Sequence, residues 1–135
     1  MNQSTPITTG AHHVGLTVSR LEESACFFIN VLGWSEVRRD SEYPAIFVTD
    51  GVLMVTLWEA KSNSPVFFNR KENIGLHHLA LSVGSFEDLD TIHNKVSAAG
   101  LKVEFPPELL RDGPVKHMMC YEPSGIRIEF ICIPR

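Results

Sequence analysis

Apolar and polar residues alternate with a period of two in two short segments of the chain that lie 65 positions apart. Residues 11–18 read AHHVGLTV, and residues 76–83 read LHHLALSV. Four of the eight positions are identical, and the other four exchange one small or apolar residue for another. Such alternation predicts a half-buried strand, and its return in the same frame indicates an internal repeat.

Each of these strands is followed by a segment in which apolar residues recur at helical spacing. In the first repeat they are Leu21, Ala25, Phe28 and Leu32; in the second they are Phe86, Leu89, Ile92, Val96 and Ala99. The first helix is expected to begin at the capping-box pattern Ser19-Arg20-Leu21-Glu22 and the second at Ser85. Gly33 and Gly100 are suited to end the two helices.

Three more strand candidates follow in each repeat. They are Trp34–Asp40, Ala45–Thr49 and Val52–Glu59 in the first repeat, and Leu101–Phe105, Lys116–Tyr121 and Ile126–Ile133 in the second. Pro106-Pro107 and Gly113-Pro114 bracket a predicted loop between the strand candidates Leu101–Phe105 and Lys116–Tyr121. The pattern predicts an α+β fold of two tandem βαβββ modules, residues 11–60 and 76–133, joined by a linker over 61–75 in one domain spanning 1–135.

Composition narrows the classes of function that fit this fold. The chain has 135 residues, 44% of them hydrophobic, and a net charge of −4, so it lacks the basic character of a general nucleic-acid binder. It has no apolar run of about 20 residues that could cross a membrane, and Met1–Gly10 has no signal-peptide pattern. Its three cysteines form no CxxC pair and are interpreted as reduced, mostly buried thiols. We expect a cytoplasmic protein that handles a small molecule.

Strand alternation places chemically active side chains on one face of the predicted sheets. His13 and His78 occupy matched positions, and each shares its face with small or polar residues, which suits a concave site. Glu129 lies among apolar residues of the last strand and needs a partner there. That partner is either Arg127 on the same face or a metal ion, for which two histidines and a carboxylate form a suitable set. His117 and Tyr121 share one face of their predicted strand, where they either line a pocket or pack against neighbouring residues without a role in the site.

These residues resemble the vicinal-oxygen-chelate superfamily, which includes glyoxalase I, extradiol dioxygenases and bleomycin-resistance proteins. The resemblance lies in His13–Val18, in Val31-Leu32-Gly33-Trp34, in His78–Val83 and in the closing segment Glu122–Glu129. It implies a cup formed by paired modules around one divalent metal ion (Ni, Zn, Co, Mn or Fe), held by His13, His78 and Glu129. It also implies a homodimer, which would cover exposed sheet edges, with the site built within one chain or across two.

The fourth metal position of this family falls on the last strand of the first module, where two residues compete. Glu59 supplies a carboxylate, but alternation puts it on the apolar face with Leu53, Val55 and Leu57. Matching that strand to Ile126–Phe130 places Thr56 at the position of Glu129 instead. The alternatives are therefore Thr56 in the site, or Glu59 as a fourth ligand.

The resemblance implies a metal-dependent, glyoxalase-like lyase or isomerase that acts on a small molecule with vicinal oxygens, in which Glu129 is both ligand and proton acceptor. Two alternatives use the same three ligands: an extradiol dioxygenase, and a fosfomycin-type transferase. A third is a non-catalytic antibiotic-binding protein. Thr17 stands where glutathione-using members have arginine, which argues against glutathione. The expected substrate pocket comprises Thr56, Trp58, Asn63, Lys116, His117, Tyr121 and Arg127.

Overall fold

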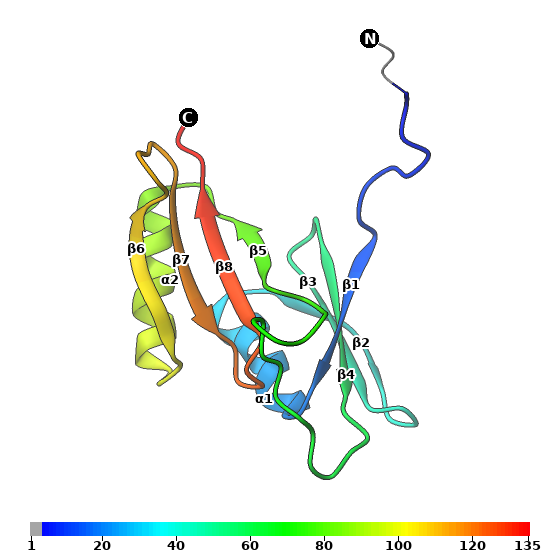
Figure 1. Ribbon diagram of the computed structural model, residues 1–135. Helices are drawn as coiled ribbons and strands as arrows, with labels where there is room; N and C mark the ends of the chain where they lie inside the picture. The colour runs from blue at the N-terminus through cyan, green and yellow to red at the C-terminus, as the bar shows by residue number, and fades with distance from the viewer. Residues whose placement is uncertain (1–3) are drawn as a thin grey trace.

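The computed structural model describes residues 4–135 and contains two four-stranded sheets with the same topology (Figure 1). The first sheet has the order β1-β4-β3-β2, and its strands are β1 (His13–Val18), β2 (Ser35–Asp40), β3 (Ala45–Thr49) and β4 (Met54–Glu59). The second has the order β5-β8-β7-β6, and its strands are β5 (Leu79–Ser82), β6 (Val103–Leu109), β7 (Lys116–Tyr121) and β8 (Arg127–Cys132). The predicted α+β fold of two βαβββ modules is confirmed. The first three residues of the polar N-terminal segment lie outside the described part of the chain.

The first helix differs from the sequence prediction, and the second agrees with it. In the first module, α1 (Leu21–Cys26) continues into a π-helical turn, η1 (Phe27–Val31), which buries both Phe27 and Phe28. The capping box predicted at Ser19 is wrong, because the N-cap residue is Arg20 and no side chain caps α1. The prediction for α2 (Phe86–Ala98) is confirmed, since the Ser85 hydroxyl accepts the Asp88 N–H at 3.0 Å.

The helices fix which face of each sheet is left for a site. In Figure 1, α2 covers one face of the second sheet, and α1 lies where the two modules meet. The helix-facing sides of both sheets contribute to one apolar core, with Leu16, Val18, Val55, Leu57, Ile128 and Phe130 among its buried members. The opposite faces carry His13 on β1, His117 on β7 and Glu129 on β8.

The strand registers of the two modules are equivalent. The parallel pair β1/β4 places Gly15 beside Thr56, and the parallel pair β5/β8 places Ala80 beside Glu129. Gly15 and Ala80 are the matched positions of the sequence repeat. Thr56 and Glu129 therefore occupy equivalent places in the two sheets.

Three further features bear on the sequence predictions. The strand β6 runs through Pro106-Pro107, where a loop was predicted; it is an edge strand with shifts in register, a position that tolerates missing N–H donors. Cys120 and Cys132 are buried as expected, whereas Cys26 is exposed. None of the helices within residues 4–135 has the length and apolar character needed to span a bilayer.

Candidate metal and substrate site

Glu129 lies between two histidines on the open face of the second sheet. Its side chain is only 11% exposed, and its Oε1 is 3.0 Å from His78 Nε2, while its Oε2 is 2.5 Å from His117 Nδ1. His78 directly precedes β5 and His117 lies on β7, so the two strands that flank β8 deliver them. The partner of this buried carboxylate is thus a pair of imidazoles, and Arg127 does not contact it.

His13, the other predicted histidine ligand, is exposed at the start of β1. Its Nδ1 lies 2.9 Å from His12 Nδ1, and no hydrogen bond or ion pair joins it to Glu129. Within residues 4–135, no three His, Cys, Asp or Glu side chains form a group that could hold a metal ion. One chain therefore brings together His78 and Glu129 of the predicted ligand set and leaves His13 apart.

Thr56 occupies the place in the first module that Glu129 occupies in the second. It is buried, and its Oγ1 accepts a hydrogen bond of 2.9 Å from the indole N–H of Trp58, two residues along the same face. A Cβ on Gly15 would lie 3.3 Å from this oxygen, so glycine permits the close approach of the two strands. Glu59 ends β4 at an alternate position to Thr56 and lies beside Val18, on the side of the sheet that faces the core.

Two of the predicted pocket residues lie away from Glu129. Lys116 extends its ammonium over the ring of Phe86, 4.7 Å from the centroid, and so contacts the helix that covers the other face of the sheet. Asn63 is exposed in the segment between the modules and does not line the main cavity. In contrast, Tyr121 and Arg127 both line that cavity.

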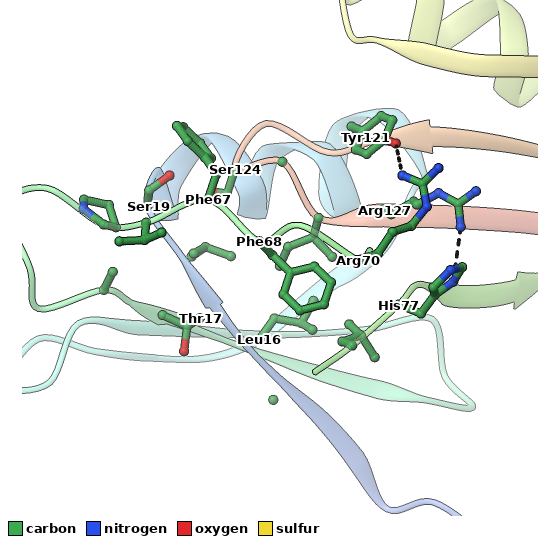
Figure 2. Close-up of a pocket in the computed structure, with 18 residues that line it drawn as sticks. Leu16, Thr17, Ser19, Phe67, Phe68, Arg70, His77, Tyr121, Ser124 and Arg127 are labelled. Atoms are coloured by element: carbon green, nitrogen blue, oxygen red, sulfur yellow. Dashed lines mark hydrogen bonds between the residues drawn. The ribbon is translucent and has the colours of Figure 1, made fainter. Parts of the chain in front are cut away.

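The main cavity has a volume of about 370 Å³ and opens between β1, the linker and the turn that joins β7 to β8. Figure 2 shows Arg70, Arg127, Tyr121 and His77 gathered at one end of it. Both Nε and Nη2 of Arg127 donate to the Glu104 carboxylate, at 3.0 and 2.6 Å. This pairing with Arg127, reinforced by the Tyr121 hydroxyl, lowers the pKa of Glu104 to about 2.

Sequence reasoning missed three members of this cluster: Arg70, His77 and Glu104. Arg70 lies in the linker beside other charged residues, where a solvated charge is the ordinary interpretation. His77 directly precedes the predicted ligand His78, and its Nδ1 lies 3.3 Å from Arg127 Nη1. Desolvation, followed by the positive charge of Arg127, lowers the pKa of His77. No local pattern joins these residues, because they are 23 to 57 positions from Arg127 along the chain.

Comparison with known proteins gives related enzymes and solved structures with the same fold. The chain is 30% identical over 105 residues to a catechol-2,3-dioxygenase of Bacillus subtilis (strain 168); the match covers 75% of this chain and 36% of that protein. A glyoxylase/bleomycin resistance protein/dioxygenase domain from Frankia sp. EAN1pec superposes with a TM-score of 0.81 at 26% identity, covering 93% and 92% of the two chains.

A fosfomycin resistance protein, FosX, from Listeria monocytogenes has the same fold, with a TM-score of 0.73 at 20% identity and coverage of 94% and 95%. The chain spans little more than a third of the length of the curated dioxygenase that it matches. The similarity therefore does not show that this chain has the activity of that enzyme. Residues 10–130 match the family model for the glyoxalase/bleomycin resistance protein/dioxygenase superfamily. With its repeated βαβββ topology and with nearly its whole length matched, the chain belongs to that superfamily.

Proposed function

We propose that the protein is a divalent-metal-dependent enzyme of glyoxalase type, acting on a small molecule with two adjacent oxygens. The observation that carries the proposal is the buried Glu129 carboxylate, which faces His78 at 3.0 Å on the open side of the second sheet. Imidazole nitrogen and carboxylate oxygen are donors that Zn, Ni, Co, Mn and Fe accept. The donor types therefore fit the metal, although one chain supplies too few of them.

A second copy of the chain would supply the missing donor. β1 and β5 are edge strands of their sheets, and exposed edges favour pairing with another chain. His13 lies on β1, and His78 immediately precedes β5. A two-fold dimer that brings the partner's β1 beside β5 would join His13 of the partner subunit to His78 and Glu129, and the symmetry would create two such sites.

The chemistry of the proposed reaction would centre on Glu129. A divalent ion bound there would polarise the two oxygens of the substrate and stabilise the negative charge that develops on them. Glu129 would accept the proton from the carbon next to the substrate carbonyl and return it to the neighbouring carbon. His117, in contact with Glu129 Oε2, would orient the carboxylate and share the proton while Glu129 holds it.

An extradiol dioxygenase is the second candidate, favoured by Thr56. This residue leaves the fourth family position without a carboxylate, so the ligand set would be two histidines and one glutamate, as in non-haem iron oxygenases. The 30% identity to a catechol-2,3-dioxygenase supports the same alternative. The metal found after purification without added metal separates the candidates: iron together with oxygen uptake on a catechol favours the dioxygenase, and nickel, zinc, cobalt or manganese favours the lyase or isomerase.

The shared site can be tested by mixing inactive variants. His13→Ala and His78→Ala proteins are each expected to lose most of their bound metal. When they are refolded together, random pairing makes half of the dimers mixed, and one of the two sites in each mixed dimer keeps all three ligands. The mixture should therefore regain about a quarter of the wild-type metal content, measured by elemental analysis of the dimer fraction.

The matched control mixes His78→Ala with Glu129→Ala. Both changes then affect the part of the site that one chain supplies, so no mixed dimer has an intact site and no metal should return. If both mixtures stay empty while wild type binds metal, the site is built within one chain. Full metal occupancy in each of the three single variants would refute the proposed ligand set.

A further inference from the structure

The main cavity has an apolar wall and a cationic end. The wall is formed by Leu16, Val18, Phe67, Phe68, Leu76 and Ile126. Phe67 and Phe68 remain 75% and 47% exposed, so large aromatic surfaces face the cavity and the solvent without cover from the chain itself. Figure 2 shows Phe68 between β1 and the cluster formed by Arg70, Arg127, Tyr121 and His77.

The cationic end carries one net positive charge. Glu104 is the one carboxylate within residues 4–135 that pairs with either guanidinium, at 2.6 Å from Arg127 and 3.7 Å from Arg70. Because both arginines are charged at neutral pH and Glu104 is ionised, two positive charges are balanced by one negative charge. A bound monoanion would neutralise the net charge of this cluster, whereas a dianion such as a phosphate monoester would make it negative.

Arg70 has hydrogen-bonding capacity left for that anion. Its Nη1 lies 3.3 Å from the Tyr121 hydroxyl, and its Nη2 is 3.7 Å from Glu104, which is beyond the range of a good hydrogen bond. A guanidinium presents five N–H donors in a planar arrangement that matches a carboxylate. Arg127, in contrast, directs three of its nitrogens to Glu104 and His77 and is held in place by them.

We propose that this cavity binds a small organic carboxylate, with the carboxylate on Arg70 and an apolar or aromatic body against Phe67 and Phe68. Arg127 and Glu129 lie on the same face of β8, two residues apart, so such a ligand would extend from the cavity toward the site proposed for the metal. That the ligand is a substrate rests on the proposed function. Its binding to the cavity does not, because neither Arg70 nor the phenylalanines belong to the proposed ligand set.

Phenylacetate and its neutral isostere phenylacetamide are suitable probes. Titrated by calorimetry or NMR into the full-length protein as purified, phenylacetate should bind roughly tenfold or more tightly than the amide, as expected for a charge-assisted hydrogen bond. Arg70→Gln should remove this preference, and Arg70→Lys should restore part of it. Arg38→Gln is the matched control: this exposed arginine on β2 contacts Asp40 at 3.6 Å and is not one of the residues that line the cavity, so its loss should leave the preference intact.

Several outcomes would overturn the proposal. Equal binding of the two compounds to wild type, or an undiminished preference in Arg70→Gln, would exclude the assigned carboxylate site. Tighter binding of phenyl phosphate than of phenylacetate would exclude the monoanion class. Loss of phenylacetate binding in Glu129→Ala or after treatment with EDTA would assign the ligand to the metal, whereas retained binding supports the cavity even if the metal proposal fails. The comparison on wild type does not depend on any variant folding.

Discussion

Glu122 is the buried carboxylate through which the two modules are hydrogen-bonded, and its replacement should weaken the whole fold. It lies in the turn between β7 and β8 and is 2% exposed. Its Oε2 accepts the Ser24 hydroxyl of α1, in the other module. Its Oε1 accepts the backbone N–H groups of Ser124 and Ile126 at 2.7 and 3.1 Å.

The cost of Glu122→Ala follows from the donors that it leaves behind. The Ser24 hydroxyl keeps a partner, because Ser124 Oγ lies 2.6 Å away. The N–H groups of Ser124 and Ile126 lose theirs; both are only partly buried, so each unsatisfied donor should cost about 1 kcal/mol, the lower end of the range for buried donors. We expect the free energy of unfolding at pH 7 to fall by about 2–3 kcal/mol. Ser24→Ala removes the hydrogen bonds of its hydroxyl with Glu122 and Ser124 and should cost about 1–2 kcal/mol.

The pH dependence of Glu122 runs opposite to that of a salt-bridged acid. Burial raises its pKa above the ordinary value of 4.5, against the opposing hydrogen bonds from Ser24 and the backbone. The part of its contribution to stability that depends on protonation is therefore fully present below pH 4.5 and is lost as the pH rises through the raised pKa. Glu122→Gln keeps an acceptor but does not titrate. The stability of wild type relative to this variant should decrease as the pH rises above 4.5.

Urea unfolding followed by tryptophan fluorescence measures these changes, since Trp34 is buried in the core and should report its loss. Glu108→Ala, at an exposed position of β6, is the matched control and should change stability by less than about 0.5 kcal/mol. A loss below about 1 kcal/mol in Glu122→Ala would refute the assigned role. So would a wild type that gains stability over Glu122→Gln as the pH rises.

Three further predictions concern single side chains. Glu129→Gln should retain metal while turnover falls by about 10²–10⁴-fold if Glu129 is the proton acceptor; equal losses of iron and of rate on the same preparation would favour the dioxygenase. A maleimide should modify the exposed Cys26 first and Cys120 only after unfolding, because burial raises the pKa of Cys120 to about 12; mass spectrometry of tryptic peptides would show the order, and early labelling of Cys120 would contradict it. Ser85→Ala should lower the free energy of unfolding by about 1 kcal/mol through loss of the α2 cap, and an unchanged urea midpoint would contradict that.

Most of the fold could be predicted from the internal repeat in the sequence, for a physical reason. Strand alternation and the matched frame of His13 and His78 determine which face of each sheet is buried, and a slip of one residue would invert that face. The prediction that Thr56 corresponds to Glu129 follows from the same logic, and the registers Gly15 to Thr56 and Ala80 to Glu129 agree with it.

The features that escaped prediction depend on tertiary contacts. The π-helical turn at Phe27–Val31 departs from the regular helical spacing so that two adjacent phenylalanines can both be buried. Pro106-Pro107 is typical of a loop, but an edge strand accommodates it. The cluster of Arg70, Glu104 and Arg127 joins the linker to two strands, and residue spacing gives no sign of such long-range pairing.

The two modules share a topology but have diverged in the chemistry that they support. At equivalent positions one has Glu129, held by two imidazoles, and the other has Thr56, whose oxygen already accepts a hydrogen bond from Trp58. A buried carboxylate among histidines can bind a cation or take a proton, whereas a buried hydroxyl bonded to an indole can do neither readily. The second module therefore has the chemically competent half of the proposed site. The first module's proposed contribution is His13, at a strand end that is exposed in a single chain.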